Sequence, residues 1–338
     1  MKVLVTGGTG FVGSHVARQL QAAGHTVRLL VRSQDKARAY FEGLGESVPE
    51  LVTGDITDPE SVRAALAGCK SVVHAAAGTP IGSTREQLQA VNVDGTKNVV
   101  NNALLQGIEH IVCVSSITAI FNEDGARVTP DAPPAPSKLP YGQSKVAAEL
   151  FLRELQASGE SISIVYPGGI VGPDDPSLSD SMKALQHRIQ NGFRIFGDGG
   201  MQQVDVRDLA AFICDLATAG GGGRFLVPGV YLKWTQLADV VQEQSGCDLQ
   251  RIPAQGWKLR LIGRIVDVVR KFRTVDSPIS AETMRYATLW PHIKNTDELA
   301  RRNIALRDPR ETFGDSIAWM VKAGYLEAAQ CPAIAETE

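Results

Sequence analysis

The sequence predicts an α/β fold: a doubly wound parallel sheet, with a smaller C-terminal α/β lobe. Three observations support this prediction: a glycine-spaced turn near the N-terminus, apolar segments that alternate with helical patterns up to residue 172, and a less regular pattern after it. Buried strands that alternate with amphipathic helices form parallel βαβ units. With 338 residues, the chain is long enough for about two domains of roughly 150 residues each.

The glycine-spaced turn, GGTGFVG at residues 7–13, lies between an apolar segment, Lys2–Thr6, and a helical pattern, Val12–Ala23. Its glycines allow a sharp turn, a close approach of backbone N–H groups to a pyrophosphate, and tight packing of helix on strand. A glycine triplet alone is a weak signal, but both flanks are correct here, so we expect a dinucleotide at this turn. The residues expected to contact it are Gly7, Thr9, Gly10, Phe11, Val12 and Gly13.

Six apolar segments predict the parallel strands, and helical patterns lie between them. The predicted strands are Val3–Thr6, Val27–Val31, Glu50–Thr53, Ser71–His74, His110–Val114 and Ile162–Tyr166. The predicted helices are Val12–Ala23, Glu60–Ala67, Leu88–Gln106 and Tyr141–Ala157. Asp58 and Pro59 are an N-cap and a first-turn proline for the second of these helices.

The domain boundary is expected near residue 172. Residues 1–172 should form the cofactor-binding domain and residues 173–330 the substrate-binding lobe, with about 201–230 returning to the first domain. Gly220–Gly223 stand directly before an apolar segment, Arg224–Val227, which indicates a helix end and a return to the sheet rather than a linker. The helices expected in the lobe are Met182–Gln190, Thr235–Gln244, Lys258–Phe272 and Asp308–Ala323. After Tyr325 no period is evident, and we expect fraying.

The composition is that of an ordinary globular protein: 43% hydrophobic, 21% charged, with a formal net charge of −3. The basic residues are dispersed, which argues against a nucleic-acid partner. Five well-separated cysteines form no C-x-x-C pair, so we expect free thiols in a reducing cytoplasm and no metal site. We expect no signal peptide ahead of the strand that starts at Lys2, and no segment has transmembrane length.

A tyrosine and a lysine four residues apart, Tyr141 and Lys145, are the strongest catalytic signal. At this spacing two side chains share one face of a helix, and the ammonium would lower the phenol pKa, which is ordinarily about 10. Ser115 and Ser116 follow the strand His110–Val114, where a hydroxyl can hydrogen-bond a substrate carbonyl. Taken alone, such a pair is more typical of an exposed helix face.

Six motifs in order change that interpretation. They are GGTGFVG at 7–13, GDITD at 54–58, HAAA at 74–77, VSSIT at 114–118, YGQSK at 141–145 and YPGGIVGP at 166–173. Their order and spacing resemble the extended short-chain dehydrogenase/reductase family over residues 1–230, with a pattern most like its dihydroflavonol-reductase-like and 3β-hydroxysteroid-dehydrogenase-like members. The resemblance implies a Rossmann fold, an NAD(P)-dependent oxidoreductase and a homodimer built on the helices at 88–106 and 141–157.

The resemblance also implies roles for individual residues. Tyr141 matches the catalytic acid/base, Lys145 the residue that positions the nicotinamide ribose, and Ser116 the catalytic serine, with Ser115 as its nearest competitor. The cofactor contacts implied outside the glycine turn are Asp55, Ile56, Ala75, Ala76, Ala77, Ser115, Tyr141, Lys145 and Pro167.

The choice between NAD and NADP depends on the end of the second strand. An acidic residue there would bind both ribose hydroxyls, whereas an arginine accommodates a 2′-phosphate. The sequence has Arg32 at this place and no acid before Asp35, so we expect NADP(H), with Ser33 or Lys36 assisting. The alternative is a solvated arginine.

The reaction type remains open between three classes. Sugar-nucleotide epimerases and dehydratases of this family carry an asparagine and an arginine that bind the diphosphate, where this chain has Gly169 and Met201. Their absence favours a reductase of a ketone or aldehyde, with a weakly charged, cyclic or aromatic substrate. An epimerase or dehydratase is the alternative, and a non-catalytic cofactor sensor is the third possibility.

One segment of the lobe, residues 257–273, combines an apolar helical stripe with six basic residues. The stripe consists of Leu261, Ile262, Ile265, Val268, Val269 and Phe272, and the basic residues are Lys258, Arg260, Arg264, Arg270, Lys271 and Arg273. Such a helix could lie on a membrane surface. We favour the alternative that the stripe packs on the core of the lobe, and a lid over the substrate is a third possibility.

Overall fold

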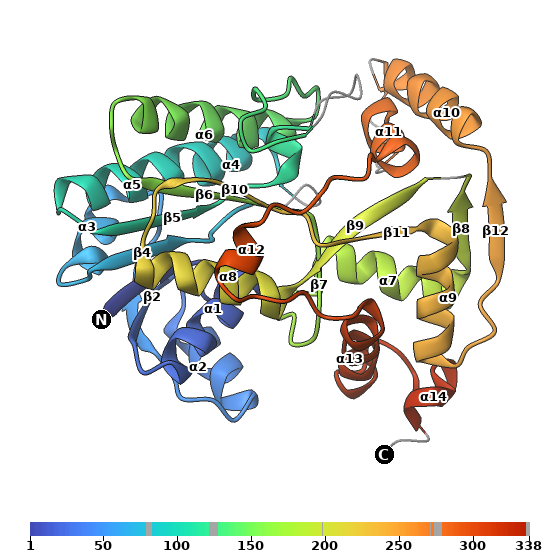
Figure 1. Ribbon diagram of the computed structural model, residues 1–338, viewed down its shortest axis with the longest axis horizontal. Coiled ribbons are helices and arrows are strands. Elements are labelled where there is room, and N and C mark those ends of the chain that lie inside the picture. Colours follow the sequence, from blue (N-terminus) through green and yellow to red (C-terminus); the bar gives the residue numbers. More distant parts are fainter. Residues whose placement is uncertain (79–82, 122–127, 198, 271, 274–278, 336–338) are drawn as a thin grey trace.

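A parallel seven-stranded sheet forms the centre of the computed structural model, which describes residues 1–78, 83–121, 128–197, 199–270, 272–273 and 279–335 (Figure 1). The strand order is β10-β6-β5-β4-β1-β2-β3, so the order reverses between β1 and β4, as in doubly wound folds. The strands are β1 (Lys2–Thr6), β2 (Thr26–Val31), β3 (Glu50–Thr53), β4 (Ser71–His74), β5 (His110–Val114), β6 (Ile162–Pro167) and β10 (Gly223–Val227). The predicted fold class is therefore confirmed.

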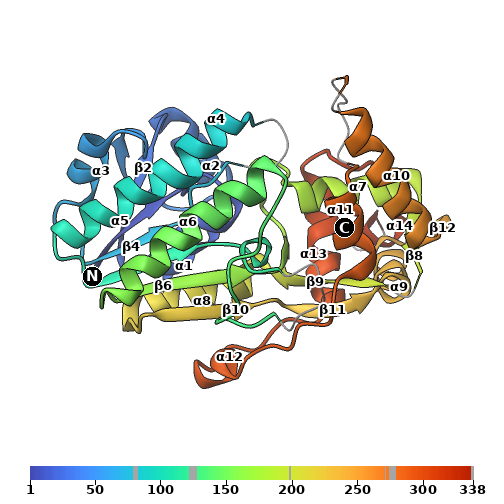
Figure 2. The ribbon, with the colours of Figure 1, turned by 90° about the horizontal axis from the view of Figure 1, so that it is seen from above.

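Helices cover both faces of this sheet, as Figures 1 and 2 show. One face packs against α1 (Phe11–Ala22), α2 (Gln34–Gly43) and α8 (Val206–Ala219). The other face packs against α3 (Pro59–Leu66), α5 (Gly95–Leu105) and α6 (Pro140–Ala157). Because a parallel sheet has both faces buried, its strands consist almost entirely of apolar and β-branched residues.

The strands predicted for the large sheet are all present, whereas two helical segments of the domain around it differ from prediction, and helix α11 (Ala281–Leu289) of the lobe was not predicted. Helix α2 was not predicted, because only Ala37 and Phe41 give its charged sequence a buried face. The helix predicted over 88–106 is divided into α4 (Arg85–Leu88), a π-helical turn η1 (Gln89–Asp94) and α5. Sequence periodicity does not reveal a π-turn, which inserts a residue without changing the composition of the stripe.

The lobe is built on two small sheets and a separate core (Figure 1). Its strands are β7 (Gly169–Val171), β9 (Gly200–Asp205) and β11 (Val230–Lys233) in one sheet, and β8 (Phe193–Phe196) and β12 (Arg251–Ala254) in the other. Helices α7 (Asp180–Asn191), α9 (Trp234–Ser245) and α13 (Pro309–Lys322) pack around a core that contains Trp234 and Phe313.

The four-glycine segment ends a helix and leads back to the large sheet, as predicted. Gly220 follows α8 with a φ of 75°, and β10 then pairs in parallel with β6. Strand β9, in contrast, pairs with β7 and β11 and not with the large sheet. Among the described residues, no helix is both long enough and apolar enough to cross a membrane.

Two expectations for the C-terminal part were wrong. Residues beyond Tyr325 do not all fray: η3 (Ala328–Gln330) and α14 (Pro332–Ala335) follow, and Cys331 between them is fully buried. Residues 336–338 lie outside the described part. The apolar stripe of α10 (Gly256–Val269) does not pack on the core of the lobe, since its large apolar side chains are exposed. Only Gly263 of α10 is buried, against α11 (Ala281–Leu289), and Lys271 lies outside the described residues.

Candidate active site

The glycine turn forms a cradle in which side chains would not fit. Gly7 has a φ of 72°, and a Cβ there would come within 2.6 Å of the Ala76 nitrogen. A Cβ on Gly13 would lie 2.2 Å from the Gly7 carbonyl oxygen. Gly10 caps α1 without any side-chain hydrogen bond, and the first turn of α1 has no acidic residue. The positive end of α1 is thus uncompensated by protein, as a pyrophosphate site requires.

The exposed Arg32 side chain comes directly after β2, and the described residues include no ion-pair or hydrogen-bond partner for it. Ser33 caps α2, its hydroxyl oxygen accepting a bond from the Lys36 nitrogen at 3.3 Å. The neighbouring strand ends alongside, because the Gly54 nitrogen donates to the Val31 carbonyl at 3.0 Å. A free cation beside a helix N-terminus is a suitable place for a phosphate.

The remaining residues expected at the cofactor follow the ends of β3, β4 and β6. The Asp55 carboxylate is held by Thr57, whose backbone nitrogen and hydroxyl donate to it at 2.9 and 2.8 Å. Ile56 is nearly buried and packs in the core beside α5. Ala75, Ala76 and Ala77 directly follow β4, and Pro167 is the last residue of β6. Parallel strands present their carboxyl ends at one edge, so all of these lie on the side of the sheet where ligands bind.

The structure brings Ser116, and not Ser115, to the tyrosine. Ser116 lies beside Tyr141 and lowers the pKa of its phenol, and the Ser116 hydroxyl oxygen accepts bonds from the nitrogen and hydroxyl of Thr118 at 3.2 and 2.9 Å. The Ser115 hydroxyl instead donates to Glu149 at 3.2 Å. The geometry thus distinguishes two adjacent serines that the sequence left in competition.

The two ionisable groups on α6 have strongly shifted pKa values. Burial raises the pKa of Tyr141 to about 12, although the neighbouring Ser116 side chain acts in the opposite direction. Burial lowers the pKa of Lys145 to about 8, against the attraction of Glu149. The Lys145 ammonium lies 5.8 Å from the centroid of the Tyr141 ring. Burial therefore outweighs the effect of Ser116, and the pKa of the phenol is raised rather than lowered.

A stripe of four polar side chains runs along α6 at intervals of four residues: Tyr141, Lys145, Glu149 and Arg153. Glu149 is fully buried, and Arg153 donates to it from Nε at 2.6 Å. The Tyr166 hydroxyl from β6 also donates to Glu149. Sequence reasoning used only the first two members. The i, i+4 spacing that identified them also extends to Glu149 and Arg153 and could have found these as well.

Asn92 is a second residue of the site that sequence reasoning missed. It lies in the π-turn η1, where its amide nitrogen donates to the Ser144 hydroxyl at 2.9 Å and its amide oxygen accepts from the Gly78 nitrogen at 2.7 Å. It thereby connects the loop after β4 to α6. The available signal was a polar residue on the otherwise apolar stripe of a predicted helix, and π-turns are frequent at functional sites.

A cavity of about 1290 Å³ opens beside Tyr141 and Thr118. Its apolar lining comes from Leu88, Leu139, Pro140, Val268, Tyr286 and Leu289. Its charged lining is Lys138, Asp180, Arg260, Arg264, Asp267, Arg270, Glu282 and Arg285. Residues from α6, α10 and α11 thus enclose a mainly apolar space with the tyrosine in its wall. The wall of this cavity contains more charged residues than the sequence suggested.

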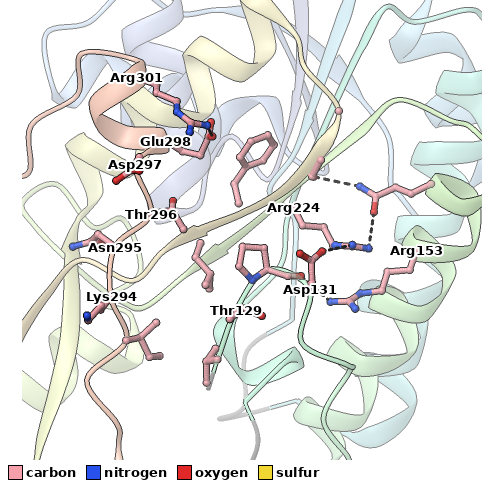
Figure 3. A pocket seen from close by; sticks show the side chains of 18 of the residues that line it. Thr129, Asp131, Arg153, Arg224, Lys294, Asn295, Thr296, Asp297, Glu298 and Arg301 are labelled. Atoms are coloured by element: carbon pink, nitrogen blue, oxygen red, sulfur yellow. Dashed lines mark hydrogen bonds and ion pairs between the residues drawn. The ribbon is translucent and has the colours of Figure 1, made fainter. Parts of the chain in front are cut away.

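A second large cavity, of about 1270 Å³, lies away from the tyrosine, between β10, the end of α6 and residues 291–301 (Figure 3). Its charges are largely paired: Arg224 with Asp131 at 2.5 Å, and Arg301 with Glu298 at 2.6 Å. Tyr141 does not line it. The candidate active site is therefore the cavity beside Tyr141.

Gly169 and Met201 are neighbours, although 32 residues separate them in sequence. They lie on β7 and β9, and a Cβ on Gly169 would be 3.5 Å from the Met201 methyl carbon. The two positions at which an asparagine and an arginine were expected for a diphosphate thus form one uncharged surface.

Comparisons with known proteins agree with this geometry. The chain is 29% identical to "Sterol demethylase protein B" of Methylococcus capsulatus, over 96% of this chain and 100% of that protein. It is 33% identical to a "Putative dihydroflavonol 4-reductase" of Synechocystis sp., over 61% of this chain and 60% of that protein. The crystal structure of gox2253 superposes with a TM-score of 0.81 at 27% identity, covering 96% of this chain and 99% of that one.

The match to a known family extends over both the glycine turn and helix α6. Residues 3–227 match the NAD dependent epimerase/dehydratase family, which is about two thirds of the 338 residues. The glycine cradle and the uncapped N-terminus of α1 are a fitting site for the dinucleotide that this family uses. The chain therefore belongs to the NAD dependent epimerase/dehydratase family and is an NAD(P)-dependent oxidoreductase of the extended short-chain dehydrogenase/reductase type.

Proposed function

We propose that the protein reduces the carbonyl group of a ketone or aldehyde with NADPH, and that the substrate has a cyclic or aromatic apolar body. The observation that carries the proposal is the position of Tyr141 in the wall of a mainly apolar cavity, with Ser116 beside it. The uncharged surface of Gly169 and Met201 favours such a substrate over a sugar nucleotide.

Three residues would carry the proton chemistry. When bound, NADPH supplies a hydride to the carbonyl carbon. Ser116 donates a hydrogen bond to the carbonyl oxygen and holds it in line with Tyr141. Tyr141 then transfers its phenolic proton to that oxygen, completing the alcohol, and Lys145 stabilises the phenolate until solvent returns the proton.

The pKa of Tyr141, about 12, supports the direction of this reaction. A phenol with such a pKa carries its proton at neutral pH, as a proton donor must, whereas an alcohol dehydrogenation would need the phenolate. Lys145, with a pKa near 8, is largely protonated at pH 7 and can offer its charge when the phenolate forms.

For the cofactor, we propose NADP(H) in preference to NAD(H), with Arg32 as the partner of the 2′-phosphate. Its exposed guanidinium at the end of β2 supports this, since a phosphate at that place would receive charge-assisted hydrogen bonds. The glycine turn, the segment after β4, Asp55, Ser115, Lys145 and Pro167 would line the rest of the cofactor. Equal or tighter binding of NADH than of NADPH would contradict the preference.

The similarity to "Sterol demethylase protein B" extends through the lobe and supports a lipophilic ring compound as the substrate. Residues 1–172, together with α8 and β10, would bind the cofactor, and the rest of residues 173–330 would bind the substrate. Much of the cavity wall comes from α10 and α11, which lie in that lobe.

The proposal is tested by following NADPH oxidation with a panel of alicyclic and aryl ketones and aldehydes, with UDP-glucose and UDP-galactose as comparison substrates. We expect saturable oxidation with at least one ring carbonyl and none with the sugar nucleotides. Turnover of a UDP-sugar with no net consumption of cofactor would show an epimerase instead. Binding of cofactor without turnover of either class would indicate a cofactor sensor.

We further propose a homodimer formed by α5 and α6, located in the cytoplasm. The dimer is supported by Leu150, an exposed apolar side chain on α6, and the location by five free cysteines. Light scattering of the wild type should give twice the chain mass, and Leu150→Asp should reduce it. A monomeric wild type would exclude this dimer.

A further inference from the structure

Helix α10 presents a large apolar surface to solvent. Seven of the eleven exposed large apolar side chains in the described residues lie between positions 257 and 272, and they are 38 to 81% exposed. They are Trp257, Leu261, Ile262, Ile265, Val268, Val269 and Phe272. At 100° per residue they occupy a single sector of the helix. Contiguous exposed apolar surface of this kind marks an interaction site.

The opposite side of α10 is already used by the fold. Gly263 faces α11 so closely that a Cβ there would lie 2.5 Å from the Ser280 carbonyl oxygen. Arg260 donates to the Thr288 hydroxyl at 2.9 Å, and Asp267 accepts from the Ala281 nitrogen at 2.9 Å. The apolar sector therefore points outward, and Figures 1 and 2 both show α10 at the outer edge of the molecule beside α11.

The charges around this sector identify the partner. Residues 257–273 contain six basic residues and a single acidic one, Asp267, which faces inward and is paired with Arg270. Two copies of this surface would bring like charges together, which disfavours a second copy of the chain as the occupant. An apolar sector with a tryptophan, bordered by lysine and arginine, matches an anionic lipid bilayer, into whose interface the side chains insert.

The cavity beside Tyr141 adds a functional reason. Arg264 and Val268 of α10 line that cavity, and Val268 also belongs to the exposed sector. A bilayer in contact with α10 would thus lie at the mouth of the cavity. We propose that α10 docks the protein on anionic membranes as an interfacial helix, so that lipophilic substrates reach Tyr141 from the lipid phase. The docking itself does not depend on the reaction proposed above.

The test measures binding of the full-length protein to vesicles, without reference to activity. Vesicles of phosphatidylcholine with about 30% phosphatidylglycerol are compared with vesicles of pure phosphatidylcholine. Near an anionic surface each cation strengthens binding roughly fivefold. Ile265→Asp places a charge in the middle of the apolar sector and should lower the partition coefficient at least tenfold. Lys258→Gln with Arg273→Gln should lower it roughly 25-fold, about fivefold for each cation removed, and about 0.5 M NaCl should weaken binding of the wild type.

The matched control is Ala64→Asp, which also introduces an aspartate at an exposed apolar residue but on α3, an element at the far end of the molecule from α10. It should bind vesicles as the wild type does. Brominated lipids should quench wild-type fluorescence, and Trp257→Phe should remove most of that quenching. Equal sedimentation of the wild type with both vesicle types, or undiminished binding by Ile265→Asp, would overturn the proposal. A third contradicting result would be a wild-type protein that does not bind vesicles and forms a dimer that Ile265→Asp separates into monomers, as measured by light scattering.

Discussion

The edge of the large sheet and the α10–α11 pair place their side chains in opposite environments: polar groups are buried and hydrogen-bonded at the first, and apolar groups are exposed to solvent on the second. At the sheet edge, Glu149 is buried and bonded to Ser115, Tyr166 and Arg153, and Asn92 is held from two sides. On α10, large apolar side chains remain exposed. Buried polar groups whose hydrogen bonds are all formed hold reacting atoms in place, whereas a large exposed apolar surface is typical of an interaction site. We therefore propose that the first region carries out the chemistry and that the second delivers the substrate.

Tyr141→Phe removes only the proposed proton donor, and we expect it to have the largest effect of the substitutions considered. We expect kcat of carbonyl reduction to fall by about 10³, because general acid catalysis contributes roughly 10² to 10⁴. NADPH should bind with an unchanged Kd, measured by fluorescence titration. Tyr231→Phe, a hydroxyl removed outside the cavity, should keep the wild-type rate. A comparable loss in both variants would contradict the role of Tyr141.

Lys145→Met should separate function from stability at the sheet edge. The pKa of this lysine falls from 10.5 to about 8 on folding, so below pH 8 the folded protein carries the full cost of a buried charge. The substitution should therefore raise the unfolding free energy at pH 7 by about 3 kcal/mol or less while lowering kcat about 10²-fold. As the pH rises above 8 the wild-type lysine loses its proton in the folded state, so the difference in stability should shrink with rising pH and vanish above about 10.5, where the unfolded chain is also neutral at this residue.

Urea titrations of the two proteins at pH 7 and pH 10 measure this difference. Lys322→Met, which changes an exposed lysine at the end of α13, serves as the control and should alter stability by no more than about 0.5 kcal/mol at either pH. A destabilised Lys145→Met protein at pH 7 would show that the ammonium is a net stabilising group.

Arg32→Asp tests the cofactor side of the sheet edge with an intermediate effect. Loss of a charge-assisted contact, and repulsion of a 2′-phosphate, should weaken NADPH binding by about 10- to 100-fold and leave NADH binding the same or tighter. The ratio of the two Kd values, from isothermal titration, gives the preference. Arg38→Asp, on the exposed part of α2, should leave that ratio within about twofold. An unchanged ratio in Arg32→Asp would mean that this arginine is only solvated.

Arg264→Gln tests the contribution of α10 to substrate binding and should have the smallest effect. Its exposed guanidinium lines the cavity from α10 and has no hydrogen-bonded partner within the part of the chain described. We expect KM for a carbonyl substrate to rise about two- to fivefold and kcat to stay constant, as for the loss of an exposed polar contact. Steady-state kinetics at saturating NADPH separates the two parameters. A fall in kcat alone would place Arg264 in the chemistry.

Most of the large sheet could be predicted from the sequence, because buried parallel strands and glycine turns depend on local residue types. The lobe was less accessible. The exposed stripe of α10 has the same period as a buried one, and only the position of α11 shows which side is covered. Sequence periodicity reports that a helix is amphipathic, but not what its apolar side faces.

In the candidate site, the sequence identified the residue types but not their electrostatics. Lys145 was expected to lower the pKa of the Tyr141 phenol, yet burial of Tyr141 dominates and raises that pKa. Ser115 and Ser116 were distinguishable only once Glu149 and Tyr141 had been placed on opposite sides of them. Such effects depend on burial and distance, which residues far apart in sequence determine jointly.

The central claim is that Tyr141 and Ser116 serve a net hydride transfer to a carbonyl carbon. Its most direct test is to incubate the protein with NADPH that carries deuterium at the transferable C4 position and a ring ketone accepted by the enzyme, and to analyse the alcohol by mass spectrometry. We predict one deuterium per molecule of alcohol, bound to the former carbonyl carbon, and one NADP⁺ formed for each. An isomerised product without net loss of deuterated NADPH would contradict the claim.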